Sequence, residues 1–162
     1  RDRLVVQKQT NQIKIDLQSF LFEIQPNLSQ RFQISLQNFK LLQPSDICPK
    51  VTFNVVDLEK VILNIVQNSV EFFDCDISEL NLKFVIQQIG NSVFLEIGDN
   101  GPGIDAEIKA KAFLPFVTTK PSAYEVGLGL AHVRQLAQAN GARVFFDEDC
   151  SPGTCLIIEF PL

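Results

Sequence analysis

The sequence predicts a single α+β domain in which helices alternate with short strands. Three long segments are predicted to be helices: Leu17 to about Gln30, Asn54 to about Phe73, and about fourteen residues from Gly127. Two pairs of segments are predicted to form antiparallel hairpins, 82–88 with 93–97 and 144–146 with 155–160. With 162 residues, of which 46% are hydrophobic and 20% charged, the chain is long enough for one sizeable core.

Composition and charge narrow the function classes. The net charge is −5, and the basic residues form no stripe, so a nucleic-acid surface is not expected. No apolar run is long enough to span a bilayer, and we expect no membrane contact by this domain. The chain starts at Arg1 and contains no methionine, so we expect a piece of a longer, cytoplasmic protein. A membrane anchor elsewhere in that protein stays open.

Cysteine usage argues against a zinc site. The chain has one histidine and no Cys-x-x-Cys pair among its four cysteines, which are Cys48, Cys75, Cys150 and Cys155. In a reducing cytoplasm we expect these residues to be buried or incidental thiols rather than disulfides.

The first third of the chain is predicted to hold one helix and three short strands. Residues 1–14 are expected to be a linker or the tail of a preceding helix, and 15–162 the domain itself. Asp16 is the expected N-cap of the first helix, and Pro26 is expected to kink it. The apolar face of this helix is formed by Leu17, Phe20, Leu21, Ile24 and Leu28. The strands are expected at 13–15, 32–36 and 51–53, with a loop at 43–50.

The helix from Asn54 to Phe73 carries the most information. Asn54 followed by Asp57 resembles a capping box. One continuous apolar arc is formed by Leu58, Val61, Ile62, Ile65, Val66, Phe72 and Phe73. Asn64 and Asn68 share a face, and the amide oxygen of Asn68, at the edge of the arc, could bind Mg²⁺. Both asparagines could instead simply solvate the helix, although asparagine is a poor helix former and calls for a reason.

The turn after residues 93–97 is the centre of the pattern. In Asp99-Asn100-Gly101-Pro102-Gly103-Ile104, two glycines let the backbone bend and let a flat ligand approach closely. The Asp99 carboxylate at the strand end could accept a hydrogen bond from the amino group of a purine. Taken alone, the same residues could form an ordinary turn.

The region after this turn is predicted to contain an anion site. A short helix is expected at 105–113 and an irregular loop at 114–125, before the helix that Gly127 opens and that ends at Asn140-Gly141. Free N–H groups at the start of a helix attract phosphate. The Walker spacing and the Gly-x-Gly-x-x-Gly pattern are both absent.

Five motifs in order carry a family resemblance. They are Asn64–Asn68 (N box), Asp99–Ile104 (first glycine box), Phe113–Lys120 (phenylalanine box), Gly127–Leu130 (second glycine box) and Gly153-Thr154. Together they make residues 15–162 similar to the catalytic, ATP-binding domain of bacterial sensor histidine kinases. That domain belongs to the superfamily of gyrase, heat-shock chaperone, histidine kinase and mismatch-repair ATPases, which has the Bergerat fold.

The resemblance implies a fold and a site. The fold is a two-layer α/β sandwich, in which three main helices cover one face of a mixed, mostly antiparallel sheet. The ligands are ATP and Mg²⁺: Asp99 would hold the adenine amino group, Asn68 would bind Mg²⁺ with Asn64 close by, and Thr154 would support the adenine pocket. Lys120 would border the triphosphate and act in catalysis with the two asparagines. The remaining nucleotide-binding residues would be Phe72, Gly101, Gly103, Ile104, Gly127, Leu128, Gly129 and Leu130.

Two positions bear on the activity. The second glycine box of the family usually starts with Gly-Thr, where this chain has Glu125 and Val126, and the negative charge puts ATP affinity or lid closure in doubt. The hydrolases of the superfamily place a glutamate where this chain has Asn64, which favours transfer to a protein histidine over hydrolysis. Glu71, one turn beyond Asn68, remains an alternative base.

The resemblance also implies partners outside this chain. His132 is the only histidine, and its position inside the helix that should cover the ligand makes it a poor phosphoacceptor. The acceptor would lie on a dimerisation domain upstream of Arg1, and residues 1–14 would be the end of that domain's helix or a linker. A response regulator receiver domain would be the next partner. The alternative function is a degenerate nucleotide-binding module that acts through protein contacts, with little or no kinase activity.

Overall fold

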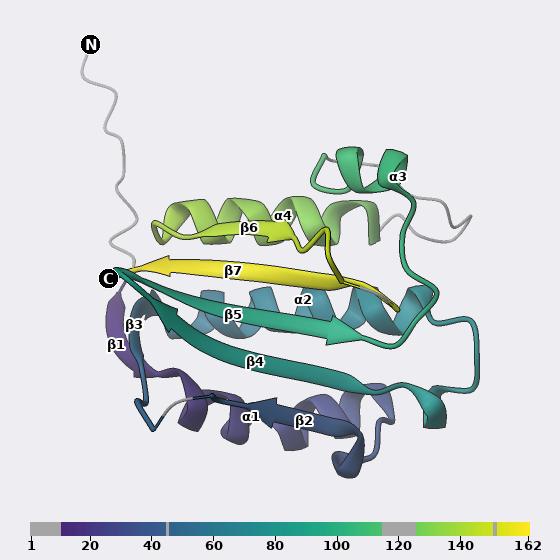
Figure 1. The fold of residues 1–162 in the computed structure, drawn as a ribbon, viewed down its shortest axis with the longest axis horizontal. Coiled ribbons are helices and arrows are strands. Elements are labelled where there is room, and N and C mark those ends of the chain that lie inside the picture. Colours follow the sequence, from purple (N-terminus) through teal and green to yellow (C-terminus); the bar gives the residue numbers. More distant parts are fainter. Residues whose placement is uncertain (1–10, 45, 115–125, 151) are drawn as a thin grey trace.

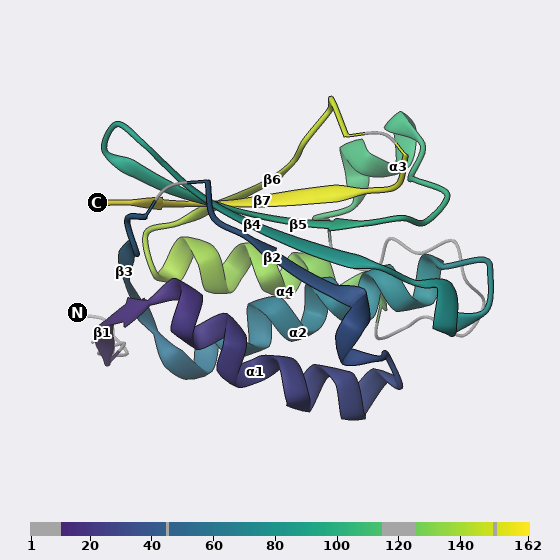
Figure 2. The same ribbon diagram turned by 60° about the horizontal axis from the view of Figure 1, so that its bottom comes forward.

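A five-stranded sheet and three helices form two layers in the computed structural model (Figure 1). The structure describes residues 11–44, 46–114, 126–150 and 152–162, and for 126–128 only the backbone. Helices α1 (Leu17–Phe32), α2 (Val55–Phe72) and α4 (Val126–Ala139) all lie on one face of the sheet (Figure 2). This arrangement confirms the expected α+β sandwich.

The main sheet is mixed. Its strands lie in the order β2 (Phe39–Leu42), β4 (Leu82–Ile89), β5 (Ser92–Asp99), β7 (Cys155–Pro161) and β6 (Arg143–Phe146). Only the β2–β4 pair is parallel. Both predicted hairpins, β4–β5 and β6–β7, are confirmed.

A second, two-stranded sheet pairs β1 (Gln12–Asp16) with β3 (Lys50–Asn54) in antiparallel orientation. These strands confirm the expectations at 13–15 and 51–53. β1 begins at Gln12, so the last part of the segment expected to be a linker pairs with β3.

The strand predicted at 32–36 is wrong. Helix α1 continues through Pro26 to Phe32, and Gln33 then takes the left-handed conformation, with φ of 58°. The N–H groups of Gln33 and Ile34 both donate to the carbonyl of Ser29, which closes the helix. The apolar spacing that suggested a strand is the end of a helix followed by the buried Ile34. The strand of the sheet comes later, at β2, after the short 3₁₀ helix η1 (Leu36–Asn38).

The core lies between the helices and the sheet. Helix α2 buries Leu58, Val61, Ile62, Ile65 and Val66 as predicted, and its N-cap Asn54 accepts a hydrogen bond from the N–H of Asp57 at 3.0 Å. The facing sheet buries alternate residues of β4, β5 and β7: Leu82, Phe84, Ile86, Val93, Leu95, Ile97, Leu156, Ile158 and Phe160. Each fully buried side chain of this size contributes about 1.5–3 kcal/mol.

Asn140, just past the end of α4, is buried and joins four segments. Its Oδ1 accepts from the side chain of Gln12 at 3.1 Å and from the backbone N–H of Asn54 at 2.9 Å. Its Nδ2 donates to Asp57 Oδ2 at 3.0 Å and to the carbonyl of Leu136 at 2.8 Å. This cluster fixes the end of α4 against the start of α2 and the small sheet, because every polar atom of the amide has a partner.

The remaining elements are short. The 3₁₀ helix η2 (Ile77–Glu79) precedes β4, and α3 (Ala106–Lys111) confirms a helix within 105–113. Helix α4 has 14 residues and ends at Asn140-Gly141 as expected, with Gly141 at φ of 78°. Most of the predicted loop at 114–125 lies outside the described residues. In the described ranges, no helix combines the length and apolar character that a membrane span requires.

Candidate nucleotide-binding site

Asp99 ends β5, and three donors from separate segments hold its carboxylate. Oδ1 accepts from the backbone N–H groups of Gly101 at 2.9 Å and Thr154 at 3.2 Å. Oδ2 accepts from the hydroxyl of Ser69 on α2 at 2.7 Å. The carboxylate is therefore fixed in one orientation between the helix layer and the turn. Oδ2 accepts only one of these three hydrogen bonds, which leaves it lone-pair capacity for a ligand amino group.

Close backbone contacts around Asp99 require glycine at two positions. Gly153 has φ of 91°, and a Cβ there would lie 1.9 Å from the backbone oxygen of Asp99. Gly103 has φ of 83°, and a Cβ there would lie 3.4 Å from the oxygen of Gly153. The first and last glycine motifs of the sequence therefore pack against each other at the Asp99 turn.

Asn68 lies on α2 directly before Ser69, and its side chain is buried. Within the described part of the chain, its amide makes no hydrogen bond. An amide without a partner among the described residues keeps its donor and acceptor capacity for a ligand. Asn64 is one turn earlier and lies against α4, because its Oδ1 would be 3.9 Å from a Cβ on Gly129. Neither asparagine simply solvates a free helix surface.

Glu71 follows on the same helix and has one unpaired oxygen. Its Oε1 accepts from the side chain of Gln67 at 3.0 Å. Its Oε2 is buried and has no hydrogen-bond partner in the part of the chain that the structure describes. The Asn68 amide oxygen and Glu71 Oε2 thus come from residues within one turn of α2. Such oxygens are the ligands that Mg²⁺ prefers, so the donor set fits that ion.

The structure brings most of the predicted site residues into one region. Asp99, Gly101, Gly103 and Thr154 are joined by the contacts above, and Asn68 directly precedes Ser69, which donates to Asp99. Ile104, which follows Gly103, and Phe72, four positions after Asn68, are half-buried. Leu130 is buried in the core. Of Gly127 and Leu128 only the helical backbone is described. Lys120, Glu125 and most of the phenylalanine box lie outside the described residues.

Sequence reasoning missed two residues that shape this site. Ser69 donates directly to Asp99, and its one available signal was a polar residue beside Asn68 on a largely apolar helix. Gly153 was noticed only as part of a motif, whereas its backbone lies against Asp99. Thr154 contacts Asp99 through its backbone N–H.

The expectation of free thiols is wrong for one cysteine pair. Cys150 and Cys155 form a disulfide, with Cα atoms 5.8 Å apart. The chain reverses between β6 and β7 through the Gly153 turn, which brings the two residues together although they are five positions apart in sequence. Cys48 and Cys75 are exposed and free.

A cavity of about 510 Å³ lies beside this disulfide. Its lining includes Asp99, Glu96, Asp147 and both cysteines. Burial, and then the nearby Asp147 carboxylate, raise the pKa of Glu96. Glu96 alternates along β5 with the buried Leu95 and Ile97, so it faces away from the helices. The disulfide thus lies on the sheet face opposite the helix layer.

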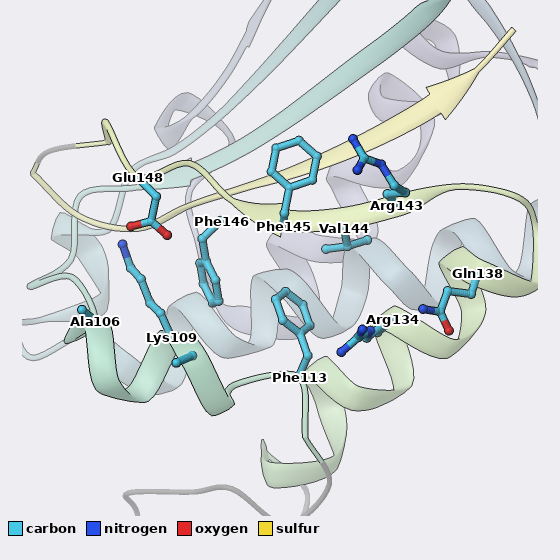
Figure 3. Close-up of a pocket in the computed structure, with 11 residues that line it drawn as sticks. Ala106, Lys109, Phe113, Arg134, Gln138, Arg143, Val144, Phe145, Phe146 and Glu148 are labelled. Carbon is cyan, nitrogen blue, oxygen red and sulfur yellow. The ribbon is translucent and has the colours of Figure 1, made fainter.

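A second cavity, of about 470 Å³, lies between α3, α4 and β6 (Figure 3). Phe113, Phe145 and Phe146 line it together with basic side chains. Arg143 is paired with Glu159 at 2.9 Å and lies over Phe145, and Lys109 lies over Phe146. We assign no ligand to this cavity, since these two cations already have partners.

Comparison with known proteins gives a consistent result. Residues 54–162 match the family model "Histidine kinase-, DNA gyrase B-, and HSP90-like ATPase". The sensor histidine kinase TmoS of Ectopseudomonas mendocina is 24% identical over 120 residues, which cover 72% of this chain and 12% of TmoS. The adaptive-response sensory kinase SasA of Prochlorococcus marinus is 26% identical over 155 residues, which cover 94% of this chain and 41% of SasA. The chain therefore spans less than half the length of these relatives.

Solved structures share the fold. The catalytic domain of histidine kinase ThkA superposes with a TM-score of 0.74 at 23% identity, over 93% of this chain and 95% of that domain. ThkA in complex with the response regulator protein TrrA superposes with a TM-score of 0.71 at 21% identity, over 93% of this chain and 41% of that one. The family match covers well over half of the chain. The resemblance predicted from the five motifs is thereby confirmed: the chain belongs to the family of histidine kinase-, DNA gyrase B- and HSP90-like ATPases and is an ATP-binding domain.

Proposed function

We infer that this chain is the catalytic domain of a two-component sensor histidine kinase. It transfers the γ-phosphate of ATP to a histidine on a dimerisation domain outside the chain. The observation that carries this inference is the Asp99 carboxylate, which Ser69, Gly101 and Thr154 hold in one orientation. The similarity to sensor kinases supports it.

Asp99 is assigned to the adenine base. Its carboxylate accepts a hydrogen bond from the amino group of the base. Ser69, Gly101 and Thr154 hold the carboxylate in place. Gly101 and Gly103 keep side chains away from the face of the base, and Ile104 and Phe72 supply apolar contact. A carboxylate that is already oriented loses little entropy when it binds the amino group, which favours selection of adenine over bases that lack that group.

Asn68 is assigned to Mg²⁺, with the free oxygen of Glu71 as a second donor. When bound, Mg²⁺ neutralises charge on the phosphate oxygens and holds them in one geometry. Asn64 lies between this position and Gly129, so its amide is assigned to the phosphates. The N-terminal turn of α4, from Gly127 to Leu130, supplies N–H groups for the same charge, and Lys120 is assigned to the triphosphate.

The side chain of Asn64 favours transfer of the phosphoryl group to a protein over hydrolysis of ATP. An amide cannot take a proton from water, so Asn64 positions groups without activating a nucleophile. Phosphoryl transfer needs mainly positioning and charge stabilisation, which the residues above provide. His132 is exposed on α4, but it belongs to the helix that covers the nucleotide, and we assign the acceptor to the upstream domain.

The partners follow from this assignment. They are the domain that carries the phosphoacceptor histidine and, after it, the receiver domain of a response regulator. The similar kinase ThkA has been solved with its response regulator, which supports this partner class. We place the domain in the cytoplasm, where ATP is available.

A transfer assay tests the proposal. Labelled ATP and Mg²⁺ are added to the 162-residue chain, with and without a separately supplied dimerisation domain. We expect label on the added domain and none on the isolated chain. Label on His132 would contradict the assignment of the acceptor.

The degenerate-module alternative makes the opposite prediction. It predicts little or no transfer, and weak or absent binding of a fluorescent ATP analogue with or without Mg²⁺. Glu125 supports this alternative, because its charge would repel phosphate. If Glu125 only slows the kinase, the variant Glu125→Gly should transfer faster than the unchanged chain.

A further inference from the structure

The Cys150–Cys155 disulfide closes a small ring around the last glycine motif. The ring contains Gly153 and Thr154, the two residues whose backbone meets Asp99. Reduction of the bond would open this ring without cutting the chain. The disulfide therefore constrains a turn that is part of the adenine pocket.

Three contacts connect Thr154 and Cys155 to the end of β5 at Gly98 and Asp99. The N–H of Asp99 donates to the carbonyl of Thr154 at 3.0 Å, and Thr154 N–H donates back to Asp99 Oδ1 at 3.2 Å. Cys155 is the register partner of Gly98, and a Cβ on Gly98 would lie 2.9 Å from Cys155 Sγ. The sulfur thus packs on the residue directly before Asp99, and position 98 has no room for a side chain.

The surroundings of Cys150 and Cys155 differ from those of a purely structural disulfide. Cytosolic proteins rarely keep permanent disulfides, and those that form are usually transient and redox-sensing. Cys150 is half-buried and lines the cavity of about 510 Å³ beside the disulfide, whereas Cys155 is buried. A small thiol can therefore reach the Cys150 sulfur more readily than the Cys155 sulfur.

We propose that Cys150 and Cys155 form a reversible thiol–disulfide site that controls nucleotide affinity through the Gly153–Thr154 turn. The disulfide form holds Thr154 N–H on Asp99 and binds ATP more tightly. The dithiol form frees the turn and binds ATP more weakly. This proposal rests on the proposed function in taking Asp99 as the adenine residue and in placing the domain in the cytoplasm.

The redox step balances with a low-molecular-weight disulfide as the oxidant. The Cys150 thiolate attacks one sulfur of oxidised glutathione, which forms a mixed disulfide and releases one glutathione thiolate. The Cys155 thiolate then attacks the Cys150 sulfur and releases the second glutathione. Two electrons pass from the cysteine pair to glutathione, and the two cysteine protons end on the two glutathione thiols.

The first measurement compares the two redox forms of the unchanged chain. One sample is treated with oxidised glutathione and one with dithiothreitol, and mass spectrometry after alkylation verifies each state. A fluorescent ATP analogue is then titrated into both. We expect about three- to tenfold tighter binding by the oxidised form, which corresponds to loosening one hydrogen bond to a charged group. Equal affinity of two verified forms would overturn the proposal.

Cysteine variants locate the effect. Cys150→Ser should bind with the affinity of the reduced chain under both conditions. The double variant Cys48→Ser/Cys75→Ser is the matched control and should keep the full redox difference, because these two thiols are exposed and free. The carboxylate of Asp74 also raises the pKa of the Cys75 thiol, which makes it a poor nucleophile. Loss of the difference in the control variant would contradict the assignment.

A readout without nucleotide separates this proposal from the proposed function. Amide hydrogen exchange of a peptide covering 152–156 should be faster in the reduced chain, because the Thr154 N–H is released from Asp99. If neither form binds ATP but exchange differs, the proposed function fails and the thiol–disulfide control of the turn stands. Equal hydrogen-exchange rates of this peptide in the oxidised and reduced chains would overturn the proposed thiol–disulfide control of the turn.

Zinc binding by the reduced thiols is the remaining alternative to a disulfide, because Glu96 and the two cysteines offer three ligand atoms within 4.8 Å of one another. A reduced chain that holds zinc on these thiols and resists oxidised glutathione would also overturn the proposal.

Discussion

Replacing Asp99 with asparagine should abolish the base preference of the nucleotide site. In Asp99→Asn, the side-chain oxygen can still accept from the N–H groups of Gly101 and Thr154, as Oδ1 does now. The new NH₂ group takes the place of Oδ2 and donates to the hydroxyl of Ser69, which can turn to accept. The fold should therefore survive, and the change should be confined to the ligand.

The size of the effect follows from this geometry. The adenine amino group would meet a donor instead of an acceptor. Loss of a hydrogen bond to a charged group costs about 1.5–3 kcal/mol, which is roughly ten- to a hundredfold in affinity for ATP. Inosine triphosphate carries a carbonyl where adenine has its amino group, so it can accept from the new NH₂ group. The variant should therefore lose the preference for ATP over inosine triphosphate.

Calorimetric titration with both nucleotides measures the prediction. Asp105→Asn is the matched control, because it removes the same charge nearby from a side chain that makes no capping hydrogen bond. The control should bind ATP within about twofold of the unchanged chain, as expected for a surface charge. An equal loss in both variants, or unchanged ATP affinity in Asp99→Asn, would refute the assignment of Asp99.

Three further changes test other parts of the structure. Asn68→Ala should abolish the tightening of ATP binding by Mg²⁺, measured against a chelator, with little change in melting temperature. Gly153→Ala should lower the free energy of unfolding in urea by about 2 kcal/mol or more, because its Cβ would collide with Asp99. Gly90→Ala, with φ of 58° and open space around it, should cost less. Burial, and then a nearby carboxylate, raise the Glu96 pKa, so folding favours its protonated form and this stabilisation disappears as pH rises through the folded pKa. Glu96→Gln should therefore melt higher than the unchanged chain at pH 8 but not at pH 4.

Local patterns were sufficient for most of the fold. Helix α2 carries its cap and its apolar arc within one segment, so its limits and its buried face could be predicted. The β4–β5 hairpin joins neighbouring segments through a short turn, and alternation identified both strands. The strand predicted at 32–36 failed because apolar residues two apart also occur where a helix ends and the next residue is buried. Only pairing with β4, about forty positions further along, distinguishes the true strand β2.

The sequence indicated which residues belong to the candidate site better than it indicated how they contact one another. Asp99 stood out because aspartate is depleted in strands, Asn68 because asparagine is a poor helix former, and the glycine motifs because of their spacing. Ser69 did not stand out, since its partner is 30 positions away. The requirement for glycine at 153 depends on the approach of Asp99, which is 54 positions away in sequence. The disulfide depends on how the chain reverses, and the expectation of a reducing cytoplasm argued against it.

The Asn140 cluster places a fixed point at the end of α4 that is remote from the nucleotide site. Asn140 joins that end to Asn54 and Asp57 at the start of α2, whereas Gly129 and Asn64 meet near the other end. Helix α4 has 14 residues and is therefore about 21 Å long. A tilt of about 5° around the anchored end would displace the glycine-rich end by about 2 Å, since the displacement grows with helix length. Any tilt of α4 around the anchored Asn140 would therefore move its glycine-rich end the most.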